Sequence, residues 1–167
     1  MYSAINLLEK LNKIKPVFVE LGLQTIHAKT AEYIRRGYTL DVYDNAVERL
    51  KNAGINVVTH IIIGLPNETK ADMLETVNYV CKAGTDGIKL QLLHVLKGTD
   101  LEAEYKCGKF EVLALDEYID ILKACVDIIP KNVVIHRLTG DGAKKDLIAP
   151  LWSADKKNVL NKINKAL

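Results

Sequence analysis

The sequence predicts an α/β fold: an open, partial (β/α) barrel of parallel strands with helices on the outside. Four apolar runs with the character of buried strands recur along the chain, and stretches of helical periodicity separate them. Polar residues lie inside these runs and at their ends, which favours strands that share a lumen. About eight strands are needed to close a barrel around a filled core, so four strands predict a partial barrel.

Helices and strands alternate through the first half of the chain. The expected helices, each with apolar residues at helical spacing, cover about 5–14, 28–36 and 40–53. Gly37 and Gly54 follow the second and third of these helices, in the left-handed position that commonly ends a helix. The first expected strand is Pro16–Gln24, and the second runs from Val57 into a Gly-Leu-Pro turn at 64–66.

The second half continues the alternation. Thr69 and Asp72 have the spacing of a capping box at the start of a helix that ends at Gly84. Ser153 is a candidate N-cap for the last helix. The remaining helices are expected at about 115–129 and 154–166, and the remaining strands at 87–94 and 132–139. Residues 97–113 show no clear period, so we expect an irregular loop, long enough to act as a lid or a substrate-binding excursion.

Composition indicates one globular domain over residues 1–167 in a reducing compartment. The formal charge of +2, from 23 basic and 21 acidic residues, gives no support for nucleic acid as a partner. Cys81, Cys107 and Cys125 are odd in number and widely spaced, which fits neither a disulfide framework nor a short metal motif. With no leader pattern and no run long enough to span a membrane, we expect a cytoplasmic protein that has no membrane partner.

Strand parity places a polar set on one face of the predicted sheet. In the first strand Phe18, Glu20, Gly22 and Gln24 share a face. We expect His60 on the same face in the second strand, and Lys89 and Gln91 on the same face in the third. We expect these side chains to line the lumen.

Several separated motifs then carry a resemblance to a known family. They are the segments Glu20–Thr25, Arg35–Tyr38, Ala53–Asn56, His60–Thr69 and His136–Asp141, followed by Pro150-Leu151-Trp152. Together they resemble the second half of a radical S-adenosylmethionine (radical SAM) enzyme. The most similar group consists of bacterial predicted Fe–S oxidoreductases related to the Elongator catalytic subunit and to oxygen-independent coproporphyrinogen oxidase.

The resemblance implies a cofactor and an assignment of residues. Such enzymes cleave S-adenosylmethionine (SAM) reductively to methionine and a 5′-deoxyadenosyl radical, which removes hydrogen from a substrate. By the resemblance, Gln24 binds the ribose and Arg36, not Arg35, meets the carboxylate. Ile62 to Leu65 would cradle adenine, with Gly64 facing the cavity. The remaining residues expected on the cofactor side are Glu20, His60, Gln91 and His94.

The sequence departs from the family in its cysteines. A radical SAM enzyme holds a [4Fe-4S] cluster on three clustered thiolates, and no such triplet occurs in this sequence. We therefore expect this chain to be the C-terminal part of a larger protein, inactive alone, with the cluster ligands elsewhere and no metal ligand here. The family implies an electron donor such as flavodoxin or ferredoxin. The substrate and the catalytic residues stay unassigned.

Other interpretations remain open at this stage. Lys89 as an imine-forming lysine with His94 as base would indicate a non-radical barrel enzyme. A non-enzymatic partial barrel would bind a partner, or a second copy of itself, through its exposed sheet edges. Glu20 and Lys89 also suit a buried structural ion pair. Three histidines, His60, His94 and His136, have spacings that fit no short metal motif.

Overall fold

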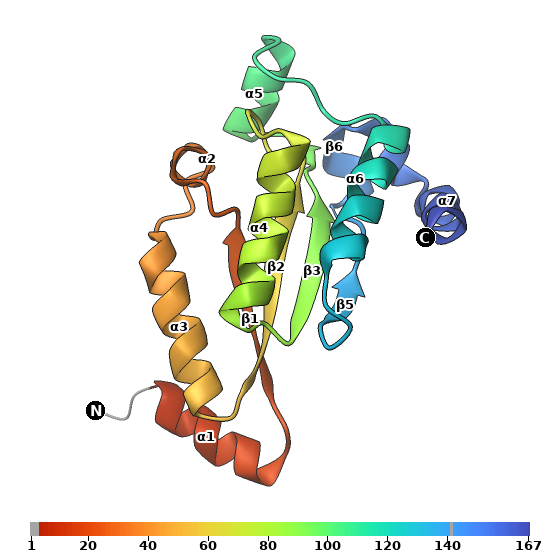
Figure 1. Cartoon of the computed structure of the whole chain (residues 1–167). Coiled ribbons are helices and arrows are strands. Elements are labelled where there is room, and N and C mark those ends of the chain that lie inside the picture. Colours follow the sequence, from red (N-terminus) through yellow and green to blue (C-terminus); the bar gives the residue numbers. More distant parts are fainter. Residues whose placement is uncertain (1–3, 141) are drawn as a thin grey trace.

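The computed structural model describes residues 4–140 and 142–167. A four-stranded parallel sheet in the order β1-β2-β3-β5 forms the centre of the molecule, and α3, α4 and α6 lie over one of its faces (Figure 1). The strands of this sheet are β1 (Phe18–Gln24), β2 (Asn56–Ile63), β3 (Gly87–Leu92) and β5 (Val134–Arg137). Two short strands, β4 (Val95–Leu96) and β6 (Leu147–Ala149), pair antiparallel beside it.

Seven α-helices and two 3₁₀ helices connect these strands in the described residues. The α-helices are α1 (Ala4–Ile14), α2 (Ala28–Tyr33), α3 (Leu40–Asn52), α4 (Lys70–Ala83), α5 (Asp100–Lys106), α6 (Leu115–Ile128) and α7 (Lys156–Ala166). The 3₁₀ helices are η1 (Lys144–Asp146) and η2 (Leu151–Ala154). Among residues 4–140 and 142–167, no helix has both the length and the apolar character needed to cross a membrane.

The two faces of the sheet differ as strand parity predicts. On the helix side, alternate residues of β2 and β3 are fully buried, among them Ile61, Ile63, Ile88 and Leu90. The opposite face carries the polar side chains, and within residues 4–140 and 142–167 no layer of helices covers it (Figure 1). The apolar core therefore lies between the sheet and the helices, and the polar face is left open.

The sheet curls into part of a barrel. Phe18 on β1 and His136 on β5 belong to opposite edges of the sheet, yet their ring centroids are 6.2 Å apart. A flat sheet would hold these strands about 14 Å apart, at roughly 4.8 Å per strand. The polar side is thus concave, which confirms the predicted partial barrel.

Helix boundaries differ from the predictions at three places. The helix expected over 28–36 ends at Tyr33, because Arg35 adopts a left-handed φ of 56°. The expected irregular loop contains α5, which begins where the hydroxyl of Thr99 accepts a hydrogen bond from the Glu102 amide. The N-cap of α7 is Asp155 rather than Ser153. The capping box of Thr69 and Asp72 is confirmed.

Candidate functional site

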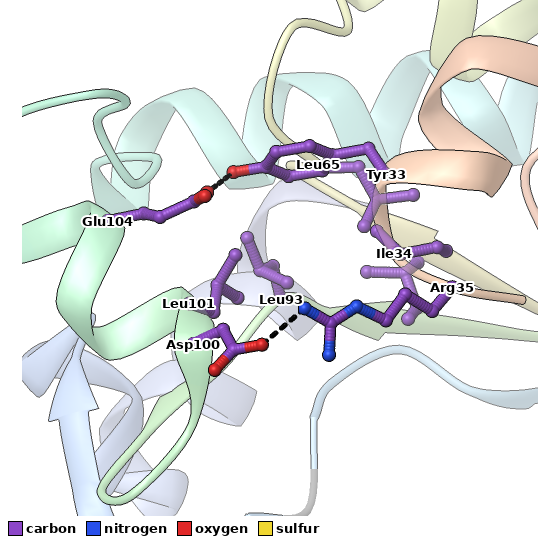
Figure 2. Close-up of a pocket in the computed structure, with 9 residues that line it drawn as sticks. Tyr33, Ile34, Arg35, Leu65, Leu93, Asp100, Leu101 and Glu104 are labelled. Carbon is purple, nitrogen blue, oxygen red and sulfur yellow. Dashed lines mark hydrogen bonds and ion pairs between the residues drawn. The ribbon is translucent and has the colours of Figure 1, made fainter.

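A cavity of about 460 Å³ lies where β2 and β3 end. Four segments that are separate in the sequence form its walls: the end of α2, the turn after β2, the turn after β3, and α5 (Figure 2). The lining residues are Tyr33, Ile34, Arg35, Ile62, Leu65, Leu93, Asp100, Leu101 and Glu104. Ile62 and Leu65, which the family resemblance assigns to the cofactor side, both line this cavity.

The strand ends give the cavity an apolar wall. Ile62 points to the open face of the sheet and is only partly buried. Leu65 and Leu93 follow β2 and β3 directly, and they are 3% and 8% exposed. Such a wall suits a flat apolar group of a ligand, with polar groups of the ligand at the rim.

The rim of the cavity is polar. Arg35 forms an ion pair with Asp100, and the hydroxyl of Tyr33 donates a hydrogen bond to the carboxylate of Glu104 (Figure 2). Burial and the Glu104 carboxylate raise the pKa of Tyr33 to about 12, and the Tyr33 hydroxyl lowers the pKa of Glu104. Glu104 is therefore an anion at neutral pH, and the rim carries two carboxylates against one guanidinium.

Gln24 ends β1 in an unusual backbone conformation. Its φ is 69°, and the pairing of β1 with β2 shifts register between Gly22 and Gln24. The side chain lies beside Gly22, so that Nε2 is 2.7 Å from the place where a Cβ on Gly22 would be. The amide thus sits on the lumen face of β1, the face on which strand parity places it.

Arg36 supports the end of β1 instead of lining the cavity. Its Nε donates to the carbonyl of Tyr38 at 2.9 Å, and its Nη1 donates to those of Leu23 at 3.2 Å and Thr25 at 2.7 Å. These bonds use three of the five guanidinium hydrogens, so Nη2 is the group left to meet a ligand carboxylate. The Arg35 side chain is 79% exposed, as expected, yet Arg35 rather than Arg36 borders the cavity.

Gly64 packs against Leu113 in the turn after β2, and its contact with adenine stays a prediction. Its φ is 88°, a conformation that L side chains rarely adopt. A Cβ at this position would lie 2.9 Å from Cδ1 of Leu113, in the segment that leads into α6. The glycine allows the turn after β2 to pass close beneath Leu113.

Below the cavity, four polar side chains form a continuous network on the concave face. Lys89 donates to both oxygens of Glu20 at 2.6 Å. His60 Nε2 lies 2.5 Å from the same carboxylate, and Gln91 Nε2 lies 2.8 Å from His60 Nδ1. The hydrogen bond from Lys89, followed by the bond to His60, holds the pKa of Glu20 below its ordinary value.

This network confirms the expected pairing of Glu20 with Lys89, but the pair is not buried. The side chain of Glu20 is 37% exposed and that of Lys89 is 15% exposed. His60 and Lys89 are partners in the strand register, four residues before Gly64 and Leu93. The network therefore lies deeper in the lumen than the cavity.

The three histidines lie in separate surroundings. His94 is held by the loop after β5: the Gly142 amide donates to its Nδ1 at 3.1 Å, and the ring packs against Gly140. His136 covers Gly87, with Nε2 only 2.6 Å from the place of a Cβ there. His94 thus packs against Gly140 and Gly142 and is not among the residues that line this cavity, and its contact with a cofactor stays a prediction. Lys89 is bonded to Glu20, so a Lys89–His94 catalytic pair gains no support.

The three cysteines lie on separate elements, and one group of other candidate metal ligands lies together among the described residues. Cys81 is on α4, Cys107 follows α5, and Cys125 is on α6. His27, Asp72 and Glu75 bring one ligand atom each within 4.8 Å of one another. Asp72 already accepts from the hydroxyl and amide of Thr69 at 2.7 Å, so the capping box accounts for its position.

The α2 and α5 walls of the cavity do not follow from the sequence patterns. Tyr33, Leu101 and Glu104 come from segments without strand character, and they meet only through the tertiary fold. One local signal was present. Thr99 followed three residues later by Glu102 is the pattern of a capping box, and it marks the start of α5.

Two family models match the chain. One, described as the radical SAM superfamily, matches residues 2–80. The other, described as the Radical_SAM C-terminal domain, matches residues 85–167. Together the two matches span nearly the whole chain, and both models describe radical SAM proteins.

Curated relatives and a solved structure agree with these matches. Uncharacterized protein YtqA of Bacillus subtilis is 42% identical over 165 residues, which is 99% of this chain and 51% of YtqA. Protein YhcC of Escherichia coli is 35% identical over 136 residues, 81% of this chain and 44% of YhcC. The structure of Elp3 from the archaeon Methanocaldococcus infernus shares the fold, with a TM-score of 0.74 at 22% identity, over 98% of this chain and 39% of that one. The chain thus spans about half the length of the curated relatives it matches.

Proposed function

Because this chain belongs to the radical SAM superfamily, we propose that its cavity holds the adenosyl part of SAM and that the chain is the cofactor-binding part of an enzyme. The observation that carries the proposal is the cavity itself. It lies at the strand ends, contains Ile62 and Leu65, and has the size of a small-molecule site.

The chemistry of the lining supports this choice of ligand. An apolar wall of Ile62, Leu65 and Leu93 suits the face of adenine. The rim carboxylates of Asp100 and Glu104 suit a ligand with positive charge, such as the sulfonium and ammonium groups of SAM. On this proposal Gln24 presents its amide to the ribose hydroxyls, and Arg36 holds the end of β1 in place through the carbonyls beside Gln24.

The described residues do not fit a [4Fe-4S] cluster. Burial raises the pKa of Cys125 to about 12 and also raises that of Cys81, whereas a cluster ligand must be a thiolate. We therefore place the cluster ligands in a further segment of the protein. When SAM is bound beside a reduced cluster, it supplies the 5′-deoxyadenosyl radical that is common to the superfamily.

In this arrangement the chain binds and orients SAM. The network of Glu20, His60, Lys89 and Gln91 lines the lumen beneath the cavity, and its hydrogen bonds hold the four side chains in place. A substrate would meet the cofactor from the concave face, and a one-electron donor such as flavodoxin or ferredoxin would serve the cluster.

A chimeric protein tests the proposal. The chain would be fused to the part of Bacillus subtilis YtqA with which it does not align, then reconstituted anaerobically with iron and sulfide. We expect 5′-deoxyadenosine to form from SAM under reducing conditions, and Gln24→Ala to abolish or strongly reduce it. A chimera that holds a cluster but cleaves SAM equally well with and without Gln24 would contradict the assignment.

A further inference from the structure

We propose that residues 98–108 form a lid over the cavity. The lid swings about Gly98 and Gly108. Tyr33–Glu104 latches it to the last residue of α2, and Arg35–Asp100 latches it to the turn after α2. The identity of the ligand beneath the lid depends on the proposed function, whereas the motion of the lid does not. Four features of the segment support the inference.

First, the segment is bonded mainly to itself. The carboxylate of Glu102 accepts from the Gly98 amide at 2.7 Å and from Lys106 at 2.7 Å, so it ties the start of α5 to its end. These contacts allow α5 to move as one rigid piece.

Second, α5 has little hold on the core. None of its residues is buried, whereas α4 and α6 each contribute four buried residues. Helices that open locally are those with few buried apolar contacts. Leu101 is the apolar side chain that α5 contributes to the cavity wall.

Third, a glycine with positive φ stands at each end of the segment. Gly98 has a φ of 80° and Gly108 a φ of 70°, and nothing lies within 4 Å of the place of a Cβ at either. Packing therefore does not require glycine at these positions, and its backbone freedom is available for a hinge.

Fourth, the chain is anchored on both sides of the segment, at Lys97 and at Leu113. Lys97 donates its amide to Asp146 at 2.8 Å, next to the β4–β6 pair. At the other end, Leu113 packs against Gly64, and its carbonyl accepts from Trp152 Nε1 at 2.9 Å. Movement is thus confined to the stretch between two fixed points.

The two latches cross the cavity to α5 from the end of α2 and the turn that follows it (Figure 2). Both partners of the Arg35–Asp100 pair are highly exposed, at 79% and 73%. Exposed ion pairs contribute little free energy, so thermal motion can break them. The latch is therefore strong enough to favour the closed lid and weak enough to release it.

Distance measurements between spin labels test the lid without a ligand. Lys29 on α2 and Ala103 on α5, both exposed, would be changed to cysteine in a Cys81→Ala, Cys107→Ala background. We expect one main distance in this protein. Adding Tyr33→Phe and Arg35→Ala should increase a longer-distance population by about fivefold, as the loss of two exposed contacts predicts.

A matched control distinguishes the loss of the latch from a general effect of removing an exposed ion pair. Lys70→Ala removes another exposed ion pair, Lys70–Asp120 at 2.5 Å, which joins α4 to α6. It should leave the distance distribution unchanged. The lid is refuted if the latch variant shows the same distribution as its background, or if Lys70→Ala broadens the distribution equally.

A second arm adds SAM to the labelled latch variant. A shift back to the short distance supports a lid that closes on the cofactor. If calorimetry shows that SAM does not bind the unlabelled chain, the proposed function fails for this chain, and the ligand-free distances still decide the lid.

Discussion

The amide of Gln24 fills the space that a side chain on Gly22 would need, since Nε2 lies 2.7 Å from the place of the missing Cβ. Gln24, whose backbone is in the left-handed conformation, and Gly22, which has no side chain, thus form one unit at the end of β1. The carbonyl of Gly22 also accepts a hydrogen bond from the Tyr38 hydroxyl. This unit positions the group that we propose to bind the ribose.

Gly22→Ala should therefore weaken SAM binding by displacing Gln24. We expect a loss of about 1–3 kcal/mol in binding free energy, the usual cost of a lost hydrogen bond in a closed site. The stability of the domain should change little, because the clash is with the end of a flexible side chain. Calorimetric titration of Gly22→Ala, Gln24→Ala and the double variant checks this. If the two losses add in the double variant, the residues do not act as a unit.

Gly64→Ala should destabilise the fold. A φ of 88° and a contact of 2.9 Å with Leu113 both oppose a Cβ. We expect a loss of about 1–3 kcal/mol in the free energy of unfolding, measured by urea denaturation. Adding Leu113→Ala to the Gly64→Ala variant should remove the clash but not the backbone strain. It should therefore recover only part of the lost free energy of unfolding. A Gly64→Ala protein as stable as wild type would show that the turn after β2 tolerates a side chain.

Ionisation of Glu20 should make the free energy of unfolding depend on pH in the acidic range. Lys89 holds the pKa of folded Glu20 below its ordinary value of 4.5, and the unfolded chain has no such partner. The stabilising contribution is therefore complete above that ordinary value and is lost as the pH falls through the lowered pKa. Urea midpoints measured from about pH 5 to about pH 3 should fall more steeply for wild type than for Glu20→Gln. Equal slopes would mean that the Lys89 and His60 bonds do not act on this carboxyl.

Anaerobic reconstitution of the chain alone with iron and sulfide should leave it colourless. Cys125 is fully buried, Cys81 is half-buried, and Cys107 is exposed at the end of α5, so three thiolates cannot meet at one cluster. Iron analysis and the visible spectrum provide the measurement. A stoichiometric cluster that disappears in Cys107→Ala would overturn this expectation.

Sequence patterns predicted the sheet well because strand parity is a local property. The alternation of Leu90 with Lys89 and Gln91 identifies the buried and open faces without knowledge of the rest of the fold. The Glu20–Lys89 pair follows from the same reasoning, since both residues point into one lumen.

The α2 and α5 walls depend on features that local patterns do not contain. A helix that ends three residues early decides which of Arg35 and Arg36 borders the cavity. The contact between Gly64 and Leu113 joins residues 49 positions apart in the chain, so local patterns do not reveal the close packing that this glycine allows.

Filling the cavity provides the most direct test that it binds SAM. Ile62→Trp places a large ring in the cavity from the open face of the sheet, while Val42→Trp adds the same ring at a 50% exposed site on α3. In calorimetric titrations with SAM, we expect Ile62→Trp to lose at least about tenfold in affinity, or about 1.4 kcal/mol, and Val42→Trp to bind like wild type. If folded Ile62→Trp binds SAM as tightly as wild type does, the cavity is not the cofactor site.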